Sequence, residues 1–231
     1  MKAMILAAGR GSRMQGLTDT IPKPLLKVGG RTLIEHSISS CVRAGITDVV
    51  INVSYLADQI EHYLGDGDRF GASIQYSDER EAVQGTGGAV IKALPMLGED
   101  PFLLLSADVV TDFDLLRLSA LSNNSLAKLI LVNNPEHHPQ GDFSLQGGRV
   151  GFFSPRFTYA NIGLFSPELF RGQLQRVVGL AELITEAIQD EAVEGQFYNG
   201  HWFNVGTPTL LESLNARAGI PNLGGCPKKR R

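Results

Sequence analysis

Cysteine is scarce in this 231-residue chain, which contains only Cys41 and Cys226. The two lie far apart and neither belongs to a C-x-x-C pair, so we expect reduced thiols in a cytoplasmic protein. Long apolar runs are also missing, because none approaches the ~20 residues that span a bilayer. The apolar segment near the N-terminus runs directly into Gly-Arg-Gly, which differs from the order of parts in a signal peptide. We therefore expect no membrane partner.

The chain as a whole has no excess of basic residues, since its formal net charge is −3. Its first 31 residues depart from this balance, with six basic residues against the single acid Asp19. A positive charge this local suits a polyphosphate better than a nucleic-acid duplex. The sequence thus predicts a phosphate-rich ligand and no nucleic-acid partner.

Several catalytic and nucleotide-binding motifs are absent as well. The sequence contains neither the G-x-S-x-G nucleophile motif nor the H-E-x-x-H zinc motif, and it has no G-x-x-x-x-G-K-[ST] phosphate loop. The dinucleotide fingerprint G-x-G-x-x-G fails because Met14 stands where the third glycine belongs. These absences are consistent with a reaction that needs no nucleophile from the protein.

What is present is concentrated in the first thirty residues. Residues 4–8 form an apolar run that leads into Gly9-Arg10-Gly11-Ser12-Arg13, which predicts a buried strand ending in a backbone turn. Glycines at such a turn let amide groups approach an anion without a side chain in the way. Lys23 follows between two prolines, Pro22 and Pro24, which restrict it towards an extended conformation. Alone it would be an exposed loop lysine, but after this turn we interpret it as a phosphate ligand.

The rest of the first half alternates helical and strand patterns. Helices are expected at residues 31–44, 57–64 and 86–97, and strands at 49–53, 73–76 and 102–106. This alternation predicts an α/β fold with a doubly wound, mostly parallel Rossmann-like sheet. Ligands bind outside the carboxyl ends of such strands, so residues 9–13 and Asp108 should meet at one edge.

The pattern changes near residue 126. Strands at 129–133, 143–145 and 159–165 are separated by turns, and helices are expected at 180–188 and 209–216. With no repeat or linker, we expect a single domain over residues 1–218, followed by a tail at 219–231. Its first part, up to about residue 125, would bind the nucleotide. The remainder, 126–218, would cover the mouth of the sheet and supply a sugar pocket.

Residues 6–13, followed by Pro22-Lys23-Pro24, resemble the signature of the sugar-1-phosphate nucleotidyltransferases. The resemblance extends to about residue 218 and is greatest to the uridylyltransferases that act on N-acetylmuramic acid 1-phosphate in peptidoglycan recycling. It implies that UTP and a sugar 1-phosphate give a UDP-sugar and pyrophosphate. The catalytic step would be in-line attack on the α-phosphorus, helped by positioning and charge neutralisation. The family often has proline where Gly16 stands and glycine where Ala107 stands.

The resemblance also implies site residues. Arg13 and Lys23 would contact phosphates, and Asp108 with Asn204 would hold Mg²⁺. The nucleotide would be contacted by Ala7, Ala8, Gly9, Gly11, Gln84, Gly85 and Thr86. Asn204 stands where related enzymes more often have aspartate, and it adds no negative charge to the metal site. Without the resemblance, Asp108 and Asn204 are turn residues and Thr86 is a helix N-cap.

The sugar would be contacted by Gly141, through its backbone, and by Asp142 and Asn161 through their side chains. For Asp142, bonding to local loop backbone is an equal alternative. His137 and His138 have no acidic or cysteine partner at ligand spacing, so we interpret them as surface histidines.

Three alternatives stay open. Another base and sugar could be used, as in guanylyl- or thymidylyltransferases acting on mannose, heptose or glucose 1-phosphate. A nucleotide-sugar sensor without catalysis is a second, and a cap role for Asn204 is a third. The lactyl carboxylate of muramic acid has no assigned partner, although Arg80 and Arg156 are candidates. Nothing demands more than a monomer.

Overall fold

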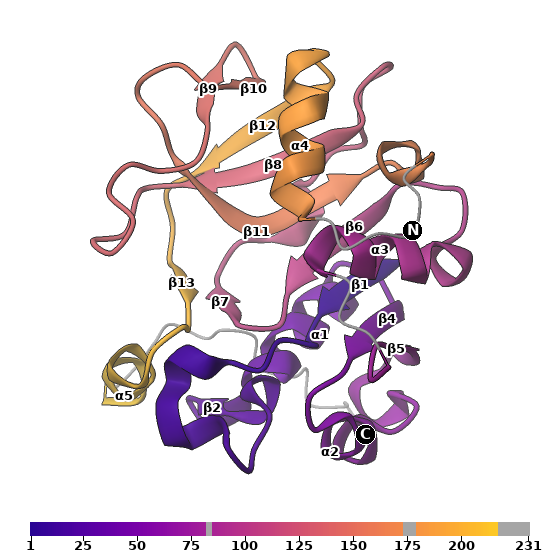
Figure 1. Ribbon diagram of the computed structural model, residues 1–231, viewed down its shortest axis with the longest axis vertical. Coiled ribbons are helices and arrows are strands. Elements are labelled where there is room, and N and C mark those ends of the chain that lie inside the picture. Colours follow the sequence, from indigo (N-terminus) through magenta and orange to yellow (C-terminus); the bar gives the residue numbers. More distant parts are fainter. Residues whose placement is uncertain (82–84, 173–178, 217–231) are drawn as a thin grey trace, which may run out of the picture.

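The computed structural model describes residues 1–81, 85–172 and 179–216. A nine-stranded sheet runs through it in the order β5-β4-β1-β6-β11-β8-β12-β10-β9 (Figure 1). The strands are β1 (Ala3–Leu6), β4 (Asp48–Val53), β5 (Ser73–Asp78), β6 (Phe102–Ser106), β8 (Ala127–Val132), β9 (Ser144–Gln146), β10 (Arg149–Gly151), β11 (Thr158–Phe165) and β12 (Val193–Tyr198). Strands β5, β4, β1 and β6 are all parallel, as predicted. Beyond them β11 is antiparallel to both neighbours, and β8 pairs in parallel with β12.

Helices cover both faces of this sheet. On one face lie α1 (Leu33–Arg43) and α2 (Ala57–Leu64), and on the other lie α3 (Gly85–Leu97) and α4 (Leu180–Gln189). Successive residues of a strand point to opposite faces, so Ile5 packs with α1 and α2 while Met4 packs with α3 and α4. The fold is therefore doubly wound, and parallel strands buried on both sides explain the apolar runs in the sequence.

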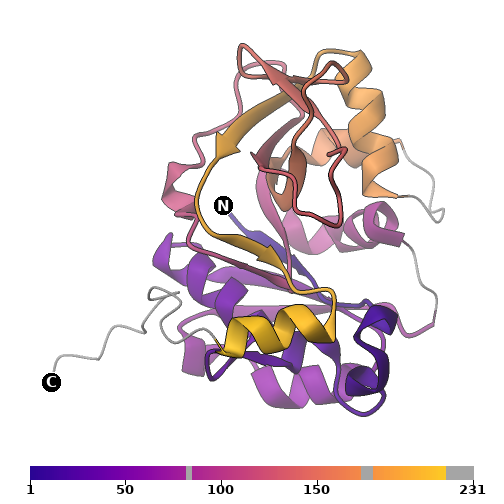
Figure 2. The ribbon, with the colours of Figure 1, turned by 90° about the vertical axis from the view of Figure 1, so that its left-hand side faces the viewer.

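Two small sheets and α5 (Pro208–Ala216) complete the described structure. Strand β7 (Val109–Thr111) pairs antiparallel with β13 (Trp202–Asn204), and β2 (Lys27–Val28) pairs with β3 (Arg31–Thr32). A separate apolar cluster joins α5 to β2 and β7. Helix α5 also contacts residues 12–18, and Figure 2 shows it lying beside this indigo part of the chain. Short 3₁₀ helices lie at η1 (Ser12–Thr18), which is kinked at Gln15, η2 (Lys23–Leu25), η3 (Asp68–Phe70), η4 (Leu115–Arg117) and η5 (Pro167–Phe170).

The predicted elements differ from the observed ones mainly at their ends. Strand β1 stops at Leu6 rather than continuing to Ala8, because the Ala7 amide donates to the side chain of Asn52 at 2.7 Å. Strands β2, β3, β7, β10, β12 and β13 were not predicted, and β3 occupies the first two residues of the helix expected at 31–44. Gln84, Cys226 and the tail at 219–231 lie outside the described residues. None of the helices in the described part of the chain has the length and apolarity of a membrane span.

Candidate active site

A cavity of about 860 Å³ opens at the carboxyl ends of β1, β4, β5 and β6. Its walls come from the loop after β1, the start of α3, the loop after β8, strand β11, α4 and β13. This is the edge at which an open α/β sheet binds ligands. The volume lies within the range of sites that enclose a small-molecule ligand.

The loop after β1 separates the roles of its two glycines. Gly9 has no atom within 4 Å of the position that a Cβ would occupy, so its backbone faces open space in the cavity. Gly11 has φ of +69°, and a Cβ there would lie 3.0 Å from Lys23 Cβ and 3.3 Å from Thr18 Cγ2. Gly9 thus leaves room for a ligand, whereas Gly11 makes room for Lys23.

Lys23 is buried, with a relative exposure of 9%, and it lines the cavity. The extended conformation predicted for it is wrong, because Lys23 begins the 3₁₀ turn η2. Pro24 fits this first turn, where its missing amide hydrogen costs no internal bond. Pro22, which precedes the turn, is extended, and the Leu25 amide donates to its carbonyl at 2.8 Å. The ammonium group of Lys23 forms an ion pair with the carboxylate of Asp108.

Asp108 and Asn204 are brought together by backbone pairing. Asn204 lies opposite Val109 in the β7–β13 pair, and the Val205 amide donates to the Asp108 carbonyl at 2.9 Å. The Ser106 hydroxyl orients Asp108 by donating to its Oδ1 at 2.6 Å. The Oδ1 atom of Asn204 is buried and has no hydrogen-bond partner in the described structure. A buried acceptor without a donor is costly, which suits a site where a ligand supplies the positive partner.

These groups fit a hard cation. Mg²⁺ takes carboxylate and amide oxygens and keeps water or phosphate oxygens in its remaining positions. No cluster of three or more histidine, cysteine or acidic side chains suited to a metal occurs within residues 1–81, 85–172 and 179–216. A cation here would therefore depend on Asp108, Asn204 and the phosphates of a substrate. Arg13 lies nearby, because a Cβ on Gly206 would be 3.6 Å from its Cζ.

Sequence reasoning missed two polar side chains that line the same cavity. Asn52 and Glu79 are 3% and 2% exposed, and Asn52 Nδ2 donates to Glu79 Oε1 at 2.7 Å. The amide of Ala7 already donates to Asn52 Oδ1, so this predicted nucleotide contact would not be made through the Ala7 amide. The signal was an amide within the apolar strand pattern of residues 49–53.

Gly85 and Thr86, predicted to contact the base, are the first residues of α3 and line the cavity. Thr86 does not cap its own helix. Its hydroxyl oxygen accepts from the Leu180 amide at 3.0 Å and so ties α3 to the start of α4. The third predicted base contact, Gln84, lies outside the described residues.

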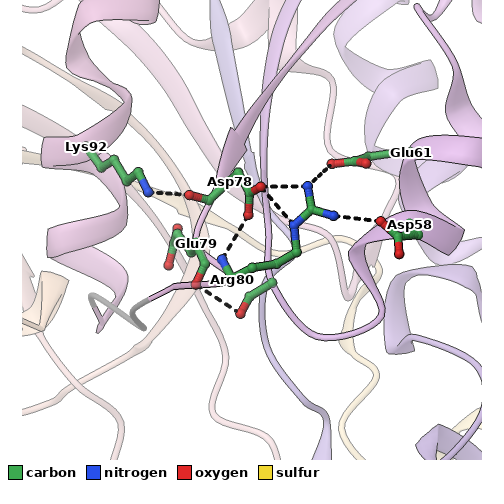
Figure 3. Close-up of polar contacts among 7 residues, drawn as sticks. Asp58, Glu61, Asp78, Glu79, Arg80 and Lys92 are labelled. Atoms are coloured by element: carbon green, nitrogen blue, oxygen red, sulfur yellow. Dashed lines mark hydrogen bonds and ion pairs between the residues drawn. The ribbon is translucent and has the colours of Figure 1, made fainter.

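The two arginines considered for a carboxylate ligand do not line the cavity. Figure 3 shows the Arg80 guanidinium among three acidic residues. It donates to Asp58 at 2.6 Å, to Asp78 at 2.8 Å and to Glu61 at 3.5 Å. Arg156 donates to the Phe152 carbonyl at 3.0 Å. Both guanidinium groups are thus held elsewhere.

The predicted sugar contacts gather in the loop after β8 and in β11. Gly141 has φ of +63°, and a Cβ there would lie 2.6 Å from Asn134 Oδ1, so only glycine fits. Asp142 faces the cavity, but its Oδ2 already accepts from the Tyr159 amide at 2.8 Å. A sugar hydroxyl would have to share these oxygens, which favours the local role for Asp142. Burial raises the pKa of the Tyr159 phenol, which stays neutral.

Asn161 lies within β11 at a change of register. The pairing with β8 shifts between Tyr159 and Gly163, and Asn161 has φ of +55°. A left-handed residue inside a strand is unusual, and such bulges often direct a side chain into a site. Trp202 supports the bulge by donating from Nε1 to the Ala160 carbonyl at 2.9 Å. Asn161 and Trp202 both line the cavity.

The interpretation of His137 and His138 as surface histidines is incomplete. Both line the cavity, and His138 Nε2 lies 3.0 Å from Asp142 Oδ1. The turn that brings them together is local, since the His138 amide donates to the Pro135 carbonyl and the Gly141 amide donates to the His138 carbonyl. The acidic partner was thus four residues away in the sequence.

Comparison with known proteins places this geometry in context. An N-acetylmuramate alpha-1-phosphate uridylyltransferase from Neisseria meningitidis serogroup B is 42% identical over 95% of this chain and 99% of its own length. A mannose-1-phosphate guanyltransferase beta-A from Xenopus laevis is 30% identical over 90% of this chain, which spans 62% of that protein.

Solved structures share the fold. A putative glucose-1-phosphate thymidylyltransferase from Bacillus anthracis superimposes with a TM-score of 0.80 at 20% identity, over 94% of each chain. The inositol-1-phosphate CTP transferase from T. maritima gives 0.74 at 18% identity, over 92% of this chain and 94% of its own. The model of the family described as "Nucleotidyl transferase" matches residues 2–147. With this match, and with the Neisseria relative aligned over nearly its whole length, the chain belongs to the nucleotidyl transferase family.

Proposed function

We propose that this protein joins UTP and N-acetylmuramic acid α-1-phosphate to give UDP-N-acetylmuramic acid and pyrophosphate. An oxygen of the sugar phosphate attacks the α-phosphorus of UTP, and the bond to the pyrophosphate oxygen breaks. The observation that carries the proposal is the 42% identity to the Neisseria enzyme over nearly the full length of both chains. The name of that enzyme describes this reaction.

The geometry of the cavity supports such a transfer. Lys23 and Arg13 supply positive charge beside the open backbone of Gly9, where the triphosphate would lie. Lys23 is fixed by the turn η2, so it loses little freedom on meeting a phosphate. Fixed positive groups stabilise the charge that develops on the leaving pyrophosphate. No covalent intermediate with the protein is needed.

Asp108 and Asn204 are the proposed ligands of Mg²⁺. When bound, the ion would draw charge from the phosphate oxygens and hold the triphosphate in line for attack. The unpartnered Oδ1 of Asn204 and the carboxylate of Asp108 support this assignment. Ser106, which donates to Asp108, orients the carboxylate in this role.

The remaining contacts divide between base and sugar. The proposed base contacts are Gln84, Gly85 and Thr86, and the proposed sugar contacts are Gly141 and Asn161. Asp142 would contribute only by sharing oxygens that already bond the Tyr159 amide and His138. We propose that residues 1–125 form the nucleotide-binding part and 126–218 the sugar-binding part of one domain, with a tail at 219–231. The protein is proposed to act as a cytoplasmic monomer.

A second candidate is a guanylyl transfer to mannose 1-phosphate, which the Xenopus relative favours. Pyrophosphate release in a matrix of four nucleoside triphosphates and several sugar 1-phosphates separates the two. Release with UTP and N-acetylmuramic acid 1-phosphate supports the first reaction. Release with GTP and mannose 1-phosphate alone supports the second, and no release with any pair would favour a sensor.

A further inference from the structure

We propose that His137 and His138 form a subsite for an anionic substituent on the sugar, the lactyl carboxylate of N-acetylmuramic acid. This inference rests on the proposed function and names the residues that recognise the lactyl carboxylate of the substrate. Muramic acid differs from glucosamine by a lactyl ether at O3, so an enzyme that selects it gains by contacting that carboxylate.

The distribution of positive charge around the cavity points to these histidines. Arg13 and Lys23 lie with Asp108 and Gly206 at the phosphate end. Among the other described residues that line the cavity, only the two histidines can carry positive charge. Arg80 and Arg156, the arginines considered from the sequence, are held outside the cavity.

The two imidazoles differ in what they already bond. His138 Nε2 is 3.0 Å from Asp142, which fixes the ring and leaves Nδ1 as its other polar atom. His137 is exposed to the cavity, and no hydrogen bond or ion pair in the described part of the chain involves its side chain. An imidazole can donate from one nitrogen in either neutral tautomer and from both when charged. His137 is therefore the group available to donate to a carboxylate.

The loop that carries them is fixed before any ligand binds. Asn134 Nδ2 donates to the Pro139 and Arg156 carbonyls, both at 3.0 Å, and its Oδ1 accepts from the Thr158 hydroxyl at 2.9 Å. Asp142 is held in turn by the Tyr159 amide. A contact made from a preorganised loop costs little ordering entropy, so it can contribute fully to selectivity.

The test compares two substrates that differ only in the lactyl group, N-acetylmuramic acid 1-phosphate and N-acetylglucosamine 1-phosphate, with UTP at saturation. The quantity measured is the ratio of kcat/KM for the first to kcat/KM for the second. In His137→Ala this ratio should fall roughly tenfold, as for loss of one hydrogen bond to a charged group. His137→Arg, which keeps a cationic donor, should retain most of the ratio.

Three controls make the outcome decisive. His62→Ala removes an exposed histidine of α2 and should leave the ratio unchanged. Thermal unfolding of each variant checks that the fold is intact. Arg176 is a further cation and lies outside the described residues. Arg176→Gln is therefore measured in parallel, to compare its effect on the ratio with that of His137→Ala.

A ratio unchanged in His137→Ala, or lost in Arg176→Gln alone, would overturn the subsite while leaving the proposed reaction intact. A wild-type ratio near one would do the same. Turnover of neither sugar phosphate by the wild-type protein would instead overturn the proposed function. A tenfold fall in His137→Ala with rescue in His137→Arg supports the subsite.

Discussion

The ammonium group of Lys23 is paired with the carboxylate of Asp108, 85 positions later in the chain. The pair is largely buried, with side-chain exposures of 11% for Lys23 and 18% for Asp108. The proposed phosphate ligand and the proposed metal ligand therefore neutralise each other. When a triphosphate and its metal ion bind, Lys23 would instead contact a phosphate and Asp108 would contact the metal ion. Because the two side chains are paired before binding, removing one also changes the surroundings of the other.

Replacing Lys23 with methionine tests this relationship. Lys23→Met removes the cation proposed to meet the phosphates, so kcat/KM for UTP should fall about 100-fold or more. It also frees Asp108 from its partner, so affinity for Mn²⁺ alone, measured by electron paramagnetic resonance, should rise. Lys27→Met, which replaces an exposed lysine of β2, should change neither quantity. An unchanged kcat/KM in Lys23→Met would remove the phosphate role.

Substitutions of Asn204 should change the Mg²⁺ concentration needed for half-maximal activity. Asn204→Ala removes the buried oxygen and should raise the Mg²⁺ concentration for half-maximal activity by about tenfold. Asn204→Asp adds a negative charge and should lower that concentration. Titration of activity with Mg²⁺ measures both, with Asn199→Ala as an exposed control. Identical metal dependence in all four proteins would leave Asn204 as a turn residue.

Gly11 predicts a combined loss of stability and activity. In Gly11→Ala the added Cβ meets Lys23 at 3.0 Å on a backbone with φ of +69°. We expect a loss of about 1–2 kcal/mol in the free energy of unfolding and a lower kcat/KM, because Lys23 must shift. Gly98→Ala is the matched control, since Gly98 has φ of +90° and open space around it. Gly98→Ala should be less stable than wild type in urea unfolding but should keep the wild-type kcat/KM. If Gly11→Ala and Gly98→Ala have equal kcat/KM, then the Gly11 substitution has not displaced Lys23.

Much of the first half of the chain was predictable from the sequence. Its strands are short apolar runs and its helices have clear periodicity, so α1, α2, α3, β4 and β6 were placed within about two residues. The recognised motif also identified residues 7–13, Lys23 and Asp108 as a group. Every member of that group except Arg10 lines one cavity.

Other features depend on tertiary contacts that have no local pattern. Strands β7 and β13 have three residues each, too short for a periodic signal, and only their pairing brings Asn204 to Asp108. The Lys23–Asp108 pair and the Asn52–Glu79 bond join segments far apart in sequence. The bulge at Asn161 follows from pairing with β8, which the residues alone do not reveal.

The carboxylate of Glu194 should make the free energy of unfolding depend on pH below about pH 4.5. Burial by itself raises the pKa of Glu194, but hydrogen bonds from Ser122 and Lys128 outweigh burial and lower the pKa to about 2. Because the folded pKa lies below the unfolded value of 4.5, the contribution is complete above about pH 4.5 and is lost as the pH falls towards 2. The contribution of Glu194 to the free energy of unfolding should decrease by about 2 kcal/mol between pH 7 and pH 3.

Urea unfolding at the two pH values measures this loss. Glu194→Gln should be less stable than wild type at pH 7, because Lys128 is buried and loses its partner, but should lose less between pH 7 and pH 3. Glu186→Gln, on the exposed side of α4, should follow the wild-type protein. An identical pH dependence in Glu194→Gln would refute the assignment.

Steady-state release of pyrophosphate from UTP and N-acetylmuramic acid 1-phosphate, with wild-type protein and with Asp108→Ala, tests the central claim most directly. The wild type should form UDP-N-acetylmuramic acid in a Mg²⁺-dependent reaction, confirmed by mass spectrometry of the product. Asp108→Ala should be less stable, because buried Lys23 loses its partner, and below its unfolding temperature it should show no measurable turnover, since the carboxylate proposed to hold the metal is gone. Normal Mg²⁺-dependent rates in Asp108→Ala would contradict the account.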